Sequence, residues 1–143
     1  MPTELSVNGL ADLPRAAAEV REALGDGRVL LLGGDLGAGK TTFTQVFYRA
    51  LGVKDAVSSP TFSLVNEYVR ELPEGSSEPA YHLDLYRLKD VEEALAMGLE
   101  EYLYSGHYCV VEWPAVAEGL YPPDALRLHL ESTGATTRKI LLL

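Results

Sequence analysis

Residues 33–42 read GGDLGAGKTT and place a lysine and two threonines directly after a run that holds four glycines. Within this run, residues 34–41 fit the pattern G-x-x-x-x-G-K-[ST], in which glycines let backbone N–H groups turn toward a phosphate chain. The pattern has this meaning only where a strand leads into the loop and a helix leads out of it. The flanking sequence therefore decides between a phosphate-binding loop and a flexible turn.

Both flanks have the required character. Residues 28–32, RVLLL, form an apolar run with the length of a strand that is buried on both faces. After the loop, apolar residues recur at the spacing of one helical face before Gly52: Phe43, Val46, Phe47, Ala50 and Leu51. The order strand, loop, helix predicts a nucleotide whose phosphates lie at the positive end of the helix dipole.

The loop residues are expected to divide their roles between the phosphates and a metal ion. The cradle of the phosphate chain comprises Gly34, Asp35, Leu36, Gly37, Ala38 and Gly39. We expect Lys40 to contact the β- and γ-phosphates and the Thr41 hydroxyl to bind Mg²⁺. Thr42 either assists the start of the helix or contacts a phosphate oxygen.

Two acids follow strand-like segments, where a carboxylate that holds Mg²⁺ or the attacking water is expected. Glu112 ends the apolar run CVV, and Asp84 lies in YHLDLY, on one strand face with His82. The alternatives are an exposed acid at a strand end for Glu112 and a solvated strand face for Asp84. We predict that both acids act at the metal and the attacking water.

A loop and an aromatic residue complete the candidate site. Residues 58–62, SSPTF, hold Ser58, Ser59 and Thr61 around Pro60, where a sensor of the γ-phosphate is expected; the alternative is a turn that caps the next strand. Trp113, next to Glu112, is either a core residue or a lid. The guanine-reading pattern [NT]-K-x-D is absent from the sequence, which disfavours a GTPase.

Length, charge and cysteine content narrow the class of protein. The 143 residues predict one domain over residues 1–143, and no apolar run is long enough to cross a membrane. We expect a cytoplasmic protein. Its net charge of −9 disfavours direct binding to nucleic acid, since the basic residues are dispersed. The single cysteine, Cys109, lies in an apolar stretch and is expected to be a buried thiol.

The remaining segments predict an α/β fold, a P-loop NTPase-like domain with a mixed parallel and antiparallel sheet and helices on both faces. Strands are expected at residues 4–7, 62–69, 80–88, 107–113 and in a C-terminal hairpin, with an exposed loop over residues 71–79. A helix is expected over residues 13–24, with Asp12 as its cap and Pro14 in its first turn, and Asp90 is expected to cap a further helix. The middle strands are not separated by helices, which indicates some antiparallel pairs.

Five segments together resemble the bacterial TsaE (YjeE) family, small P-loop ATPases required for threonylcarbamoyladenosine formation in tRNA. They are GDLGAGKTT, SSPTFSLVNEY, HLDLYRL, EEALAMGLEEYL and VVEWP, in the family's order and across nearly the whole chain. The first segment is common among nucleotide-binding proteins, whereas SPTF, DLYRL and VEWP together are specific.

The resemblance implies an ATPase that uses ATP/ADP and Mg²⁺ and acts on the TsaD and TsaB proteins. It implies that Lys40 and Thr41 are phosphate and Mg²⁺ ligands, that Thr61 belongs to a switch-like loop, and that Asp84 and Glu112 are required for activity. It places Trp113 beside the nucleotide. Two other functions stay open on the sequence alone: a nucleotide-dependent binding switch with incidental hydrolysis, and a small-molecule kinase.

Overall fold

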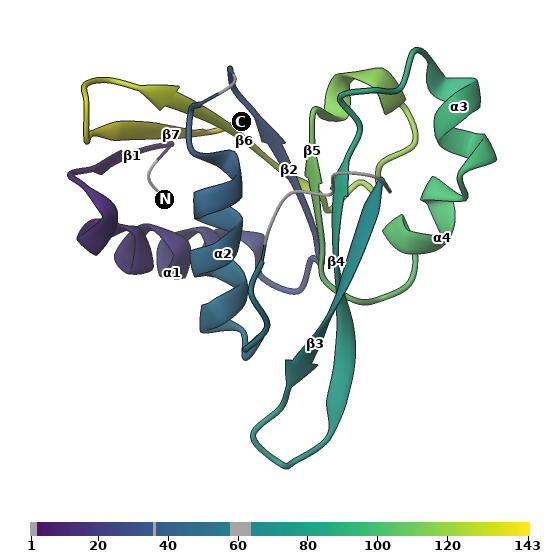
Figure 1. Cartoon of the computed structure of the whole chain (residues 1–143), viewed down its shortest axis with the longest axis horizontal. Helices are drawn as coiled ribbons and strands as arrows, with labels where there is room; N and C mark the ends of the chain where they lie inside the picture. The colour runs from purple at the N-terminus through teal and green to yellow at the C-terminus, as the bar shows by residue number, and fades with distance from the viewer. Residues whose placement is uncertain (1–2, 36, 58–63) are drawn as a thin grey trace.

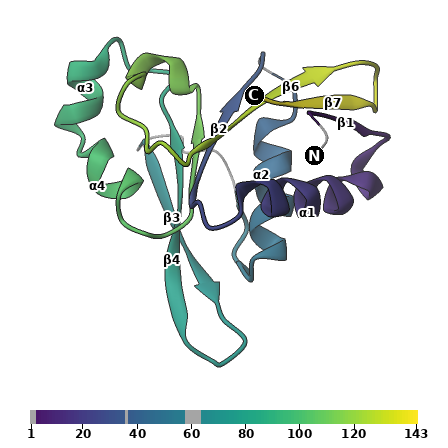
Figure 2. The same ribbon diagram turned by 180° about the vertical axis from the view of Figure 1, so that it is seen from behind.

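The chain forms a single seven-stranded sheet with helices on both faces (Figures 1 and 2). The computed structural model describes residues 3–35, 37–57 and 64–143. Its strands are β1 (Glu4–Val7), β2 (Val29–Gly33), β3 (Val65–Glu71), β4 (Ser77–Asp84), β5 (Cys109–Glu112), β6 (Leu126–Ser132) and β7 (Arg138–Leu142). Its helices are η1 (Leu10–Asp12), α1 (Leu13–Leu24), α2 (Lys40–Ala50), α3 (Val91–Ala96), α4 (Leu99–Leu103) and η2 (Pro114–Ala117).

The sheet is mixed, as the sequence predicts. Its strand order is β1-β7-β6-β2-β5-β4-β3, and the four adjacent strands β6, β2, β5 and β4 are parallel. The pairs β1–β7, β6–β7 and β3–β4 are antiparallel. Leu32 pairs with Glu112, and Glu112 pairs with Asp84, so the ends of three parallel strands meet at one edge. Ligands of open α/β sheets bind outside this edge.

Two apolar layers sandwich the sheet. On one face, Leu30 and Leu32 of β2 pack in the core that α1 and α2 cover, while on the other face Val29 and Leu31 pack in the core of α3, α4 and η2. Both faces of β2 and β5 are buried, which explains why these strands read as continuous apolar runs. Glu112 shares a face of β5 with Val110, the face covered by α2.

The β3–β4 hairpin differs in extent from the sequence prediction. Residues 71–79 were expected to form one exposed loop, but β3 continues to Glu71 and β4 begins at Ser77, where the two residues pair. Arg70 and Glu78 form an ion pair across this arm at 2.7 Å. The hairpin projects beyond the rest of the molecule (Figure 1). Its polar sequence resembles a loop because both faces of a projecting arm meet water.

Helix α1 has the predicted bounds, with Pro14 in its first turn. Asp12 occupies the cap position, but its carboxylate does not cap the helix. Instead it accepts a hydrogen bond from the backbone N–H of Asn8 at 3.1 Å and pairs with Arg15 at 2.8 Å. Asp90 caps α3 as predicted, since its carboxylate accepts a bond from the N–H of Glu93 at 3.0 Å. None of the helices in the described residues could span a bilayer.

Candidate functional site

The loop between β2 and α2 has the backbone that the glycine pattern predicts. Gly34 has φ of 135°, and a Cβ atom added there would lie 2.5 Å from the carbonyl oxygen of Leu130, so only glycine fits. Gly39 has φ of 99° and precedes the first residue of α2, where its carbonyl accepts the N–H of Phe43 at 2.8 Å. The loop therefore leads directly into a helix N-terminus, where backbone N–H groups can meet an anion.

Lys40 is almost fully buried at the start of α2, with 5% of its surface exposed. Its Nζ donates to the carbonyl oxygen of Gly34 at 2.5 Å and lies 3.6 Å from the centre of the Trp113 ring. Burial lowers the pKa of the ammonium, an effect that the nearby charges of Glu112 and Asp84 oppose. A nucleotide phosphate near this ammonium would add the anionic partner that a buried cation favours.

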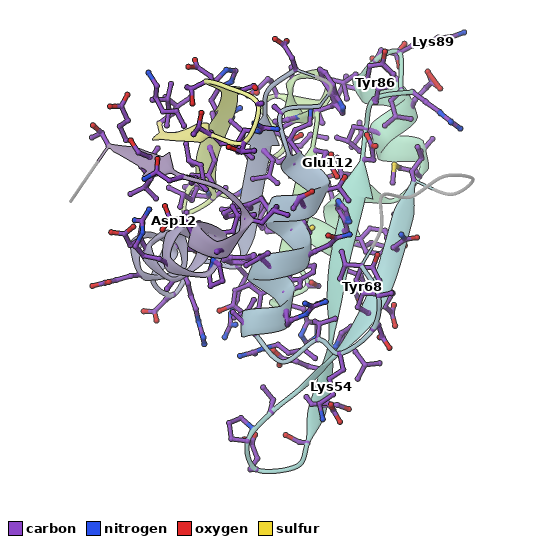
Figure 3. All side chains as sticks on the ribbon, turned by 60° about the vertical axis from the view of Figure 1, so that its left-hand side comes forward. Asp12, Lys54, Tyr68, Tyr86, Lys89 and Glu112 are labelled. Atoms are coloured by element: carbon purple, nitrogen blue, oxygen red, sulfur yellow. The ribbon has the colours of Figure 1, made fainter. Side chains whose placement is uncertain are left out.

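Glu112 lies at the end of β5, with 3% of its surface exposed. Figure 3 shows it beside helix α2. Its Oε2 accepts a hydrogen bond from the Thr41 hydroxyl at 3.4 Å and lies 2.5 Å from Nε2 of His82. The sequence alternative of an exposed strand-end acid is thus wrong. The carboxylate instead lies inside the molecule, against the threonine that follows the loop lysine.

Asp84 ends β4 directly beside Glu112 in the parallel register. Its carboxylate accepts a hydrogen bond from the N–H of Tyr86 at 3.0 Å. Burial raises the pKa of Asp84, the Tyr86 N–H opposes that rise, and the negative charge of Glu112 adds to it. Two acids on neighbouring strand ends that repel each other form a place where a cation is favoured.

The Trp113 ring contacts both the loop lysine and Tyr86, which follows β4. Trp113 has a left-handed φ of 57°, which a tryptophan rarely adopts, and its ring contacts the Lys40 ammonium. The ring also packs against Tyr86, at 4.9 Å between ring centres and an angle of 45°. The unusual backbone thus accompanies a ring that contacts both the loop lysine and the segment after Asp84.

The donor set fits Mg²⁺ bound mainly by phosphates and water. Among residues 3–35, 37–57 and 64–143, no group of three or more histidine, cysteine or acidic side chains could hold a metal ion alone. A hydroxyl from Thr41 and carboxylates from Glu112 and Asp84 are oxygen donors at one edge of the sheet. Mg²⁺ suits such a site because it keeps several waters and takes one or two carboxylates together with substrate phosphates.

A cavity of about 540 Å³ adjoins the phosphate loop. Four separate parts of the chain line it: residues 7–10, Leu13, the loop residues Ala38 and Gly39 with Thr42 of α2, and the C-terminal hairpin. From the hairpin, Arg138 reaches the loop, where its Nε donates to the carbonyl of Ala38 at 3.2 Å. This cavity cannot be predicted from local sequence patterns, because its walls are brought together by the pairing of β1, β7 and β6.

The structure brings together Lys40, Thr41, Asp84, Glu112 and Trp113, and it places Thr42 on the wall of the cavity. Leu36 and Thr61, with Ser58 and Ser59, lie outside the described residues, so the sensor loop stays a prediction. His82 was not predicted as a site residue. The signal for it was present in the sequence, since alternation in YHLDLY puts His82 and Asp84 on one strand face.

Comparison with known proteins identifies the chain's relatives. A family model described as "Threonylcarbamoyl adenosine biosynthesis protein TsaE" matches residues 7–140. The chain belongs to the TsaE family. The resemblance read from its five sequence segments is confirmed.

Individual TsaE relatives agree with this assignment. The Bacillus subtilis (strain 168) protein named "tRNA threonylcarbamoyladenosine biosynthesis protein TsaE" is 42% identical over 114 residues, which cover 80% of this chain and 68% of that protein. The Haemophilus influenzae protein of the same name is 37% identical over 103 residues, covering 72% of this chain and 62% of that one. The chain thus aligns with about two thirds of each relative.

The fold is also found in a solved structure. The crystal structure of Bacillus subtilis YdiB superposes with a TM-score of 0.71 at 33% identity, and the match covers 97% of this chain and 82% of that one. The predicted α/β class with a mixed sheet is therefore confirmed.

Proposed function

We propose that this chain binds ATP, hydrolyses it with Mg²⁺, and thereby serves threonylcarbamoyladenosine modification of tRNA. The observation that carries the proposal is the meeting of the phosphate-loop helix with two strand-end acids. Thr41 of the loop pattern lies 3.4 Å from Glu112, which is paired in register with Asp84. A helix N-terminus for phosphates next to carboxylates for a metal or a water is the arrangement that phosphoryl transfer requires.

The residues of the site have separate roles in the proposed hydrolysis. Lys40 neutralises the β- and γ-phosphates, and the backbone N–H groups of the loop bind their oxygens. Thr41 and the two acids would hold Mg²⁺, and the Glu112 carboxylate would orient the attacking water. Mg²⁺, when bound, neutralises charge on the phosphate oxygens. Trp113 covers the lysine and keeps bulk water from it, which strengthens these electrostatic interactions.

The cavity beside the loop suits the nucleoside part of ATP or ADP. Its lining is largely apolar, with Leu10, Leu13 and Ile140 among its walls and the Arg138 guanidinium at its side. An apolar slot with few polar groups is typical of sites that take a flat heterocyclic base. The cavity begins at Gly39 and Thr42, so a base bound there stays connected to phosphates held by the loop.

Family membership supports the biological role. The relatives are named for threonylcarbamoyladenosine biosynthesis in tRNA, and the family resemblance implies that TsaD and TsaB are the partners. We propose that the ATP-loaded chain docks on the TsaD–TsaB pair in the cytoplasm, and that Thr61 couples the γ-phosphate to this docking.

The test is ATP turnover by the purified chain, with and without Mg²⁺ and with and without the TsaD–TsaB pair. We expect Mg²⁺-dependent release of phosphate that the pair accelerates, and tighter capture of the pair with an ATP analogue than with ADP. Turnover that the pair leaves unchanged, together with nucleotide-dependent capture, would favour the binding switch. Transfer of phosphate to a small acceptor would favour the kinase. Capture that is indifferent to nucleotide and to Thr61→Ala would contradict the docking model.

A further inference from the structure

His82 is a fully buried histidine that touches the candidate site from inside the sheet. It lies on β4, its exposed fraction is 0%, and its Nε2 is 2.5 Å from Oε2 of Glu112. Its other ring nitrogen, Nδ1, is buried and has no hydrogen-bond partner among the residues that the structure describes. The histidine therefore makes one short polar contact, and that contact is to the acid next to Thr41.

The fold itself does not require a polar side chain at this position. In the sheet register His82 pairs with Val110 of β5, and on its own strand face it follows Ala80, both of them buried apolar residues. A buried polar atom without a partner costs stability, which an apolar side chain at residue 82 would avoid. The contact with Glu112 is the feature that sets the imidazole apart from an apolar replacement.

The arrangement of the two ring nitrogens indicates where the proton lies. With the proton on Nε2, the ring donates to the carboxylate, and Nδ1 is left as an unpaired acceptor. With the proton on Nδ1, a buried donor would lack an acceptor, which is the costlier outcome. The Nε2–H then joins the Thr41 hydroxyl on the same carboxylate oxygen, and two donors from different elements fix the plane of the Glu112 carboxylate.

We propose that His82 is a positioning residue for Glu112: its Nε2–H holds the carboxylate in the orientation that hydrolysis needs. The proposal rests on the proposed ATP hydrolysis and deepens it. Within the described part of the chain, the polar contact of His82 is with Glu112 and that of Lys40 is with the Gly34 carbonyl, so His82 acts through Glu112. Residues that orient a functional carboxylate in this way commonly change activity about tenfold to a hundredfold when replaced.

The test uses two amides that place their nitrogen at different points. In His82→Gln the amide nitrogen can stand where Nε2 stands and donate to Glu112, whereas in His82→Asn it stands near Nδ1 and cannot reach. We expect His82→Asn to lower kcat about tenfold or more with KM for ATP within about twofold, and His82→Gln to retain most of kcat. His107→Leu, at the opposite end of β5, is the control and should hydrolyse ATP at the wild-type rate.

A second measurement reads the hydrogen bond without any hydrolysis. In the nucleotide-free protein, ¹⁵N-edited NMR should find His82 protonated on Nε2, with a slowly exchanging N–H that Glu112→Ala abolishes and His107→Leu leaves in place. A proton on Nδ1 alone, with none on Nε2, would overturn the proposal. Equal kcat for the Asn and Gln variants in a chain that hydrolyses ATP would overturn the positioning role alone. A wild-type chain without turnover would instead overturn the proposed hydrolysis, while NMR still decides on the bond.

Discussion

At the scale of single residues, the candidate site combines charged groups in an unfavourable environment with a residue in an unfavourable backbone conformation. Lys40 is buried with its pKa lowered by burial, and Asp84 has its pKa raised by burial and by Glu112. Trp113 has a left-handed backbone that most residues avoid. Such features cluster at functional sites because a bound ligand supplies the missing partner.

The first prediction concerns Lys40. We expect Lys40→Ala to weaken ADP binding at least about a hundredfold, equivalent to roughly 3 kcal/mol, because the ammonium lies at the phosphate loop, 2.5 Å from the carbonyl oxygen of Gly34. Calorimetry measures this, and the fluorescence of Trp113, whose ring the ammonium touches, should change on ADP binding in the wild type alone. Lys54→Ala, which removes an exposed lysine paired with Glu71, is the matched control. Unaltered affinity in Lys40→Ala would contradict the phosphate-loop assignment.

The second prediction separates catalysis from binding at the two acids. We expect Asp84→Asn and Glu112→Gln each to lower kcat about a hundredfold while ADP affinity stays within about threefold, since neither acid belongs to the phosphate cradle. Asp84→Asn should also raise the Tm of the nucleotide-free chain at neutral pH, because it removes a half-buried charge that Glu112 repels. A wild-type kcat for both variants would show that neither acid contributes to hydrolysis.

At the scale of secondary-structure elements, the bounds of a helix or strand are predicted best where residues such as proline and glycine mark the ends of a buried segment. Helix α1 runs over residues 13–24 as expected, because Pro14 and Gly25 mark its two ends. The start of β4 was misplaced by three residues, at Ala80 rather than Ser77, since the polar arm of a projecting hairpin has no apolar alternation to read. The same limit applies to the cavity, whose walls depend on strand pairs far apart in sequence.

The third prediction belongs to the start of α1. The hydrogen bond from Arg15, with that from the Asn8 N–H, lowers the pKa of Asp12 from 3.8 to about 2. A lowered folded-state pKa stabilises the protein above the unfolded pKa, and this stabilisation disappears as the pH falls through the folded value. We therefore expect Asp12→Asn to lower Tm at pH 7, with a difference from wild type that shrinks between about pH 4 and about pH 2.

Thermal melts across this pH range test whether the hydrogen bonds to the Asp12 carboxylate stabilise the start of the helix. Asp26→Asn, which changes an exposed aspartate just beyond α1, is the control and should show no such pH-dependent difference. Because Asn8 and Leu13 line the cavity beside the phosphate loop, loosening this helix start should also weaken ADP binding slightly. A Tm difference that stays constant down to about pH 2 would mean that the Asp12 charge is not what stabilises the helix start.

At the scale of the whole molecule, the balance of charge argues against direct binding of the chain to tRNA. It carries 21 acidic against 12 basic residues, and several of the basic ones are already committed to ion pairs, as Arg70 is with Glu78 and Arg127 with Glu118. A protein that binds the tRNA backbone needs lysines and arginines free to displace counterions from phosphates. The proposed nucleotide site, by contrast, needs little positive charge beyond Lys40, Arg138 and the helix N-terminus.

The last prediction follows from this balance of charge. We expect the isolated chain to show no tRNA band shift at salt concentrations from about 50 mM to about 200 mM, a range over which phosphate-dependent binders lose most of their affinity. The TsaD–TsaB pair, mixed with the same tRNA and then with the ATP-loaded chain, is the comparison, and any shift that includes this chain should require the pair. Recruitment through protein contacts explains that requirement, since a net charge of −9 repels a polyanion wherever no basic patch intervenes. A shift by the chain alone that weakens steeply with salt would show that a basic surface exists, and would make tRNA a direct partner.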